Sequence, residues 1–184
     1  MDIVEEKECR EIATSKTHYI DCVFKQVDIK ASDIKGYEFE DCEFIGCDFS
    51  MVDLTGVAFR TVTFKECLMQ GVAFNAANPF LLSMTFDHCR LDQSVFLDMD
   101  LRSCHFKYSQ FKHGILESCK LQKVAFDETE LEQTLFYRCD LSQADFRTAI
   151  NLSFDPDNNK MKGAKFSIQT ALGLLAKYQI KITP

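Results

Sequence analysis

Every fifth residue of the chain is large and apolar over two long stretches, the first from Phe24 to Phe74 and the second from Phe86 to Phe146. All 24 positions of these two series are Phe, Leu, Ile or Met, although only 46% of the chain is hydrophobic. An amphipathic helix has a period of 3.6 residues and a half-buried strand has a period of 2. The five-residue period fits neither element and predicts a structural repeat.

A second regular position lies two residues before each large one. It holds a small or β-branched residue throughout, with Tyr37, Met84 and Met99 as the exceptions. The other three positions of each five are mostly charged or polar, so two residues in five are expected to point inward. A helix that turns 100° per residue would scatter these positions around its circumference. The chain is therefore predicted to turn a corner every five residues.

This pattern resembles the pentapeptide-repeat proteins, whose motif is a small residue, Asp or Asn, Leu or Phe, and two variable positions. Ala144-Asp145-Phe146 and Cys139-Asp140-Leu141 match the motif closely, and the resemblance covers roughly residues 17–150. It implies an all-β fold, a right-handed quadrilateral parallel β-helix with four fives in each coil. Six coils at ~4.8 Å would form a rod roughly 30 Å long. Its core ladder would include Phe24, Phe44, Phe64, Phe86, Phe106, Phe126 and Phe146.

The repeat predicts one domain, with an N-terminal cap over 1–16, the β-helix over 17–150 and a degenerate last coil with a C-terminal segment over 151–184. The spacing from Phe74 to Phe86 is twelve instead of ten, which places two extra residues near Ala77-Asn78. Pro79-Phe80-Leu81 is then a degenerate five in the second phase. Proline has no N–H for a strand ladder, so a loop is expected near residues 75–83. Its residues would be Ala76, Ala77, Asn78, Pro79 and Phe80.

The C-terminal segment predicts a short helix capped by Ser167, followed by a strand from Tyr178 to Ile182. An open solenoid end needs a polar cap or a partner, and this end is apolar. The segment resembles the helix and strand through which Qnr and MfpA proteins pair end to end. That resemblance implies a two-fold homodimer. Its interface residues would be Leu172, Leu175, Tyr178, Ile180 and Ile182.

Charge divides unevenly along the chain, whose formal net charge is −7. Residues 20–150 carry a net −8 and residues 151–184 carry a net +3. Direct nucleic-acid binding is disfavoured because phosphate contacts need a basic surface. A protein that itself binds DNA would be attracted by the same acidic surface. The candidate partner-binding residues are Asp33, Glu38, Glu40, Asp41, Glu43, Asp48, Asp53, Asp127, Glu128, Glu130 and Glu132.

The sequence shows no catalytic motif, so we expect no enzyme, no metal and no cofactor. Eight of the nine cysteines occupy the small inward position, where we expect buried, reduced thiols. The histidines are dispersed, and no phosphate-binding loop or Ser-His-Asp order is present. The charged residues 1–16 do not form a signal peptide, and no apolar stretch is as long as a membrane span. A cytoplasmic protein is therefore expected.

Two functional interpretations remain open. The acidic surface can serve only to keep a generic pentapeptide-repeat scaffold for protein–protein interaction soluble, with no topoisomerase target. The resemblance to the Qnr, MfpA and McbG types implies instead a dimeric, non-catalytic DNA mimic. Such a protein would bind DNA gyrase or topoisomerase IV and give quinolone resistance or toxin immunity. The acidity, the break and the apolar tail together favour the second interpretation.

Overall fold

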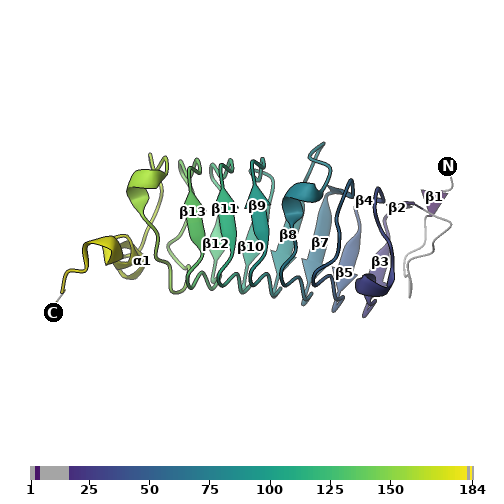
Figure 1. Ribbon diagram of the computed structural model, residues 1–184, viewed down its shortest axis with the longest axis horizontal. Coiled ribbons are helices and arrows are strands. Elements are labelled where there is room, and N and C mark those ends of the chain that lie inside the picture. Colours follow the sequence, from purple (N-terminus) through teal and green to yellow (C-terminus); the bar gives the residue numbers. More distant parts are fainter. Residues whose placement is uncertain (1–2, 5–16, 182, 184) are drawn as a thin grey trace.

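The computed structural model describes residues 3–4, 17–181 and 183. The chain winds into a parallel β-solenoid of about six turns, with the coils stacked side by side along one axis (Figure 1). The N-terminal strand lies at one end of this rod and the short C-terminal helix lies at the other. The predicted β-helix is confirmed.

The elements are short because each side of the coil spans only a few residues. The strands are β1 (Ile3–Val4), β2 (His18–Ile20), β3 (Val23–Lys25), β4 (Glu38–Glu40), β5 (Glu43–Ile45), β6 (Ala58–Arg60), β7 (Val62–Lys65), β8 (Met84–Asp87), β9 (Val95–Leu97), β10 (His105–Lys107), β11 (Ile115–Glu117), β12 (Phe126–Asp127) and β13 (Leu135–Tyr137). The helices are the 3-10 turns η1 (Ile29–Ala31), η2 (Phe74–Ala76), η3 (Pro156–Asn158) and η4 (Ala176–Tyr178), and the α-helix α1 (Ile168–Gly173).

Four faces of the rod follow from the strand pairing. The first face holds the sheet β1-β2-β4-β6 and continues through single bridges from Asp100 to Lys160. The second face holds the six strands from β3 to β12, the third is a row of bridges from Asp28 to Ile150, and the fourth holds β9-β11-β13. Phe24 pairs with Phe44 in register, so one coil takes 20 residues.

The core is the predicted ladder of large apolar side chains. All 24 positions of the two five-residue series are at most 1% exposed. Rings of successive coils stack nearly parallel, as between Phe24 and Phe44 at 4.6 Å and between Phe74 and Phe96 at 4.4 Å. Rings on neighbouring faces meet edge to face, as Phe44 and Phe49 do at 4.9 Å. Both arrangements are favoured by aromatic quadrupoles.

The corners explain why the second inward position is small and often polar. A residue with left-handed backbone forms many of the corners, such as Asp41 with φ 52 and Lys123 with φ 66. The inward hydroxyl or thiol nearby donates to a carbonyl of the preceding coil. Ser94 Oγ donates to the Met69 carbonyl at 2.6 Å, and Cys67 Sγ donates to the Phe44 carbonyl at 3.3 Å. Buried carbonyls need such partners, so these side chains also satisfy the corner.

The break in the repeat lies slightly later than the sequence suggests. Asn78 still pairs with Ala58 at the regular spacing of 20, whereas Phe64 pairs with Phe86 at a spacing of 22. The two extra residues therefore lie between Asn78 and Ser83, not near Ala77-Asn78. Ala76 ends η2 and Ala77 is buried, so the loop consists of Pro79, Phe80, Leu81 and Leu82. Figure 1 shows this teal segment at the side of the rod.

The inward residue of the irregular five is also different from the prediction. Leu82 is 7% exposed and belongs to the core, whereas Leu81 is 65% exposed. Leu81 has a left-handed backbone with φ 55, which turns the chain so that the next side chain points inward. Reading Leu81 as the centre of a degenerate five is therefore wrong by one residue.

The end of the chain confirms the helix and corrects the strand. Ser167 caps α1 by accepting from the Thr170 N–H, and Phe166 stacks on Phe146 at 5.3 Å. Tyr178 belongs to η4 and Gln179 adopts a left-handed backbone with φ 50, so the described residues from Tyr178 to 181 form no strand. A strand needs a neighbouring edge, and η4 ends in a turn instead. Ile182 lies outside the described residues.

The predicted N-terminal cap is described only at Ile3–Val4. This pair forms β1, which extends the first face by pairing with His18 and Tyr19 of β2. The rest of the predicted cap lies outside the described residues. Among the described residues, no helix has the length and apolar character that crossing a membrane requires.

The stacked core makes a specific stability prediction. Phe106 is 1% exposed and lies between Phe86 at 5.2 Å and Phe126 at 5.1 Å. Phe106→Ala should lower the free energy of unfolding by about 3–5 kcal/mol, because the backbone ladder holds the neighbouring rings apart and the gap cannot close. Urea unfolding followed by circular dichroism measures this change. Leu135→Ala, at a half-exposed strand position, is the control and should cost less than about 1 kcal/mol.

Candidate protein-binding surface

The eleven acidic residues that the sequence singles out surround the rod and do not gather on one side. Strand register and bridges place Glu38 and Glu40 on the first face, Asp41 at the next corner, Glu43 and Asp127 on the second face, Glu128 at the following corner, Asp48, Glu130 and Glu132 on the third face, and Asp33 and Asp53 on the fourth. None of the four faces is therefore uniformly acidic within the described residues. A partner that recognises these charges must contact selected corners or coils.

Many of the N-terminal acids form ion pairs with a basic residue of the next coil. Glu38 Oε2 lies 2.8 Å from Arg60 Nη1, and Lys65 Nζ contacts Glu43. Each of these pairs joins residues 22 apart in the sequence, which the coil register brings side by side. Exposed ion pairs contribute only ~0–1 kcal/mol each to stability. Their main effect is to neutralise charge on the faces that they occupy.

The same pairing extends to the third and fourth faces. Lys30 Nζ lies 2.7 Å from Asp48 Oδ2, and Lys35 Nζ lies 3.1 Å from Asp53 Oδ2. The Thr55 hydroxyl donates to Asp53 at 2.6 Å, and the Thr55 N–H donates to it at 2.9 Å. The Thr55 hydroxyl, then the Thr55 N–H and then Lys35 lower the pKa of Asp53 to about 2. Asp53 therefore stays charged in all but strongly acidic solution.

Five of the candidate acids keep an uncompensated charge. Glu40 comes no closer to a basic group than 3.8 Å, from His18 Nε2, and is only partly compensated. Ion pairs with described residues are absent for five candidates, namely Asp33, Asp41, Asp127, Glu128 and Glu130. These five carry the part of the acidic surface that is available to a partner.

Three of the uncompensated acids lie close together at one corner. Asp127 ends β12 on the second face, Glu128 follows at the corner and Glu130 begins the third face. The Glu130 Oε2 atom accepts from Asn151 at 3.2 Å, whereas its Oε1 atom has no hydrogen-bond partner in the described structure. Glu132 is paired with Lys112 at 3.1 Å and is not part of this group. We call Asp127, Glu128 and Glu130 the acidic corner.

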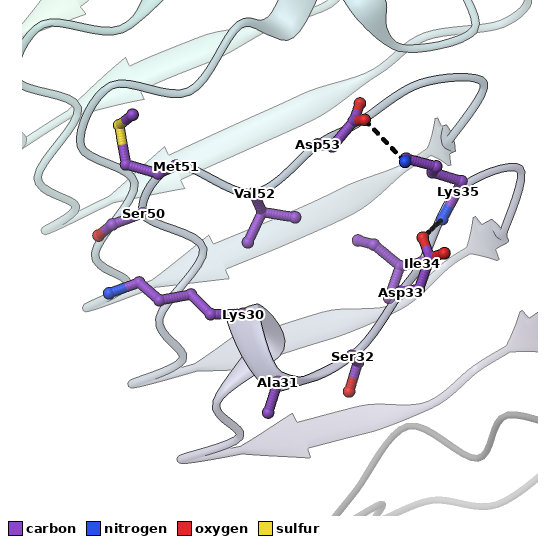
Figure 2. A pocket seen from close by; sticks show the side chains of 10 residues that line it. All are labelled: Lys30, Ala31, Ser32, Asp33, Ile34, Lys35, Ser50, Met51, Val52 and Asp53. Carbon is purple, nitrogen blue, oxygen red and sulfur yellow. Dashed lines mark hydrogen bonds and ion pairs between the residues drawn. The ribbon is translucent and has the colours of Figure 1, made fainter.

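An open pocket lies between η1 and the following coil, at the corner between the third and fourth faces. Figure 2 shows Lys35 reaching Asp53 across its upper side, with the apolar side chains of Ile34 and Val52 between the two coils. Lys30 extends along the opposite side and pairs with Asp48. The charged groups around the pocket are paired with one another. The pocket therefore offers no uncompensated charge for a ligand.

The loop adds an apolar element to the first face. Phe80 and Leu81 are 64% and 65% exposed, and the Arg60 guanidinium lies 5.9 Å from the centre of the Phe80 ring. The Phe80 N–H donates to Asn78 Oδ1 at 2.9 Å, which fixes the start of the loop. Leu82 anchors its end in the core. The loop is short and held at both ends.

The C-terminal end exposes most of the apolar residues that were predicted to pair. Leu172, Leu175, Tyr178 and Ile180 are all exposed large hydrophobic residues, and so is Ile168 before them. Gly173 lies so close to the Leu152 carbonyl that a Cβ atom there would approach the oxygen to 1.7 Å. This contact fixes α1 on the last coil. The exposed apolar side chains therefore belong to a positioned end of the rod.

The cysteines form columns inside the rod and take no part in the surface. The eight described cysteines are free and buried. Burial raises the pKa of the Cys104 thiol to about 12, so this thiol is neutral under physiological conditions. The described residues contain no group of three or more His, Cys, Asp or Glu side chains that could hold a metal ion. His88, His105 and His113 are exposed, as expected.

Sequence reasoning missed the ion pairing that divides the acidic residues into compensated and uncompensated groups. The signal for it was present in the spacing. Lys120 follows Asp100 by 20 residues and lies 3.7 Å from it, and Lys165 lies 3.8 Å from Asp145 at the same spacing. Opposite charges one coil apart in the sequence therefore indicate ion pairs in this fold. The sequence also gave no sign that Arg60 lies over Phe80.

The hydrogen bonds of Asp53 lead to a prediction about its titration. Because its pKa is lowered in the folded state, Asp53 contributes stability at neutral pH that is lost as the pH falls from about 4 toward 2. Thr55→Val should raise the pKa of Asp53 more than Lys35→Met does, since the Thr55 hydroxyl is the largest cause of the shift. Carboxyl chemical shifts from NMR titration measure both changes. A larger shift in Lys35→Met would contradict this ranking.

Comparisons with known proteins cover most of the rod. A family model described as a pentapeptide repeat region matches residues 37–113 and 81–166. A comparison with curated protein sequences found no match.

Solved structures with a similar backbone include two of QnrB1, a plasmid-mediated fluoroquinolone resistance protein. A trypsin-treated variant shares 18% identity over 98% of this chain and 99% of its own, with a TM-score of 0.47. The full-length protein shares 18% identity over 93% and 95%, with a TM-score of 0.41. HetL, a pentapeptide repeat protein involved in heterocyst differentiation regulation in the cyanobacterium Nostoc, shares 18% identity over 85% and 77%, with a TM-score of 0.37.

The matched repeat region covers well over half of the chain and coincides with the stacked coils. The five-residue period, the 20-residue coil and the family model all describe the same architecture. The chain therefore belongs to the pentapeptide-repeat family and is a non-catalytic scaffold protein.

Proposed function

We propose that this protein is a DNA mimic that binds a type II topoisomerase, DNA gyrase or topoisomerase IV. By occupying the DNA-binding surface of the enzyme it would protect or modulate it, and so give quinolone resistance or immunity to a toxin. Exposed carboxylates would stand where the phosphates of a duplex stand and would meet the basic residues of the enzyme. Such binding is electrostatic and weakens as salt rises.

The observation that supports this proposal most directly is the acidic corner. Asp127, Glu128 and Glu130 are within four consecutive residues, and none of them has an ion-pair partner among the described residues. A surface that only had to stay soluble would tolerate the same compensation that Glu38 and Glu43 show. The uncompensated oxygen of Glu130 also lacks a donor that a lysine or arginine of a partner could supply.

The apolar C-terminal end extends the proposal to a dimer. Two copies that pair through Leu172, Leu175, Tyr178 and Ile180 would form one longer rod with an acidic N-terminal half at each tip. Burying these side chains against a second copy removes apolar surface from water. A cytoplasmic location is part of the same proposal, because the target enzymes act on cytoplasmic DNA.

A generic scaffold without a topoisomerase target is the second candidate. It is favoured by the ion pairs between coils, which compensate several of the N-terminal acids. In that case the remaining carboxylates would serve solubility. The two functions differ in what happens when the acidic corner is reversed.

Gyrase supercoiling assays with and without a quinolone, at low and high salt, test the proposal. The triple variant Asp127→Lys, Glu128→Lys, Glu130→Lys should bind gyrase on the order of 30-fold more weakly at low salt, because each contact becomes repulsive. Protection should fall in parallel. Affinity is measured by surface plasmon resonance on the immobilised enzyme.

The matched control exchanges the members of one compensated pair, Glu43→Lys with Lys65→Glu. It changes two charged positions on the second face and preserves both the pair and the net charge, so we expect nearly unchanged binding. Unchanged binding in the triple variant as well would favour the scaffold. No binding by the natural chain at either salt concentration would exclude the topoisomerase proposal.

The C-terminal dimer has a separate prediction. Leu175→Glu with Ile180→Glu places two charges on the apolar end and should convert a dimer to a monomer in analytical ultracentrifugation. Both residues are exposed in the described chain, so the fold should be unaffected. Ile45→Glu, a partly exposed change on the second face far from this end, is the control. An equal loss of mass in the control would contradict this interface.

A further inference from the structure

The first face of the rod carries an apolar pair at its middle. Phe80 and Leu81 lie in the loop that follows β6, between Arg60 on one side and Asp100 and Arg102 on the other. Both side chains are about two-thirds exposed. The loop is tied to the next coil as well, since Ser83 Oγ donates to the Ser103 carbonyl at 3.1 Å. These two side chains therefore project from a fixed position.

The two halves of the first face carry opposite charge. On the N-terminal side of the loop the face and its corner hold four acids and one base, a net −3, formed by Asp21, Glu38, Glu40, Asp41 and Arg60. On the C-terminal side they hold five bases and two acids, a net +3, formed by Asp100, Arg102, Lys120, Lys123, Asp140, Lys160 and Lys162. We call these the acidic half and the basic half.

Each half retains charges that the chain does not compensate. In the described structure Asp21 and Asp41 form no ion pair in the acidic half, and Lys123 and Lys162 form none in the basic half. The basic charges that are paired remain accessible, since the Lys120 side chain is 60% exposed. Equal and opposite charges on either side of an apolar centre are self-complementary.

Strand register shows which residues would meet. Glu38 lies two coils before the loop and Lys120 lies two coils after it, and both occupy the position just before the large inward residue. Asp41 and Lys123 lie in the same two coils, both at the left-handed corner. A two-fold axis through the loop and along the strands reverses the rod and keeps each position in its column. It therefore brings Glu38 opposite Lys120 and Asp41 opposite Lys123 of the second copy.

We infer that the first face is a self-association surface on which a second copy of this chain binds antiparallel, side by side. Phe80 and Leu81 of the two copies meet at the axis, and the acidic half of each copy contacts the basic half of the other. The contact is isologous, so each favourable pair occurs twice. It uses none of the C-terminal apolar residues.

The expected affinity is modest. One face of a rod only about six coils long offers less area than a standard protein interface, and its polar wings retain water. We expect a dissociation constant on the order of 10 μM at low salt, rising with ionic strength. The association covers Glu38, Glu40 and Asp41. It goes beyond the proposed function and leaves the acidic corner, the test site of that function, on other sides of the rod.

The experiment is a charge-exchange cycle in the background Leu175→Glu, Ile180→Glu, which removes any C-terminal pairing. Sedimentation velocity from 1 to 200 μM at low salt gives the dissociation constant of each variant. Asp41→Lys alone places lysine opposite lysine, and Lys123→Asp alone places aspartate opposite aspartate. Each should weaken association about tenfold. Both changes in one chain recreate an opposite-charge pair and should restore the natural dissociation constant.

Two further variants complete the cycle. Phe80→Ser with Leu81→Ser removes the apolar centre and should leave a monomer over the same concentration range. Asp98→Lys reverses an exposed acid at a left-handed corner beside the fourth face and should leave association unchanged. Circular dichroism confirms the fold of every variant.

The inference is overturned if the background chain is monomeric at 200 μM in low salt. It is also overturned if the double charge exchange is as weak as the single ones, or if Asp98→Lys weakens association to the same extent. A surface that instead serves another partner would give one of these results. The outcome does not depend on gyrase binding, so it is separate from the test of the proposed function.

Discussion

The 20-residue register of the coils is the constraint on which the rest of the structure depends. It places each residue directly above its counterpart in the preceding coil, so side chains at equivalent positions must be compatible along the whole rod. Phe24, Phe44 and Phe64 can stack because aromatic rings pack well on one another. The same register would place like charges side by side. The chain avoids much of this repulsion with opposite charges in adjacent coils, as in Lys107 and Asp87 at 3.0 Å.

The corners complete this arrangement. A left-handed residue at a corner costs conformational energy that an extended residue does not, and the corner leaves inward backbone groups that the strand ladder does not use. Small hydroxyl and thiol side chains bind those carbonyls, as Ser94 and Cys67 do. Cysteine is therefore suited to this position by its size and by its weak S–H donor. The cysteine content of the chain follows from the shape of the coil and needs no redox or metal function.

The core was predictable from the sequence because the register makes it strictly periodic, and all the large positions from Phe24 to Phe146 are buried. Features that depend on contact between coils were not predictable in the same way. Whether Asp53 or Asp41 keeps its charge depends on a lysine 18 residues away and on the corner geometry, not on local composition. Leu81 and Leu82 are chemically alike, and only the left-handed turn at Leu81 decides which one enters the core. The expected strand at Tyr178 failed because strand propensity is expressed only beside an edge with which to pair.

The insertion shows how this constraint also produces a surface. Two residues cannot be added inside a coil, because the coils above and below hold their register through Asn78 and again from Met84. The extra length must therefore lie outside the stack, and its side chains must point to solvent unless one of them replaces a core residue. Leu82 does so, which leaves Phe80 and Leu81 outside. A regular coil presents mostly polar side chains to solvent, so a slip in the repeat is a direct way for this fold to place a large apolar side chain at a fixed point on a face.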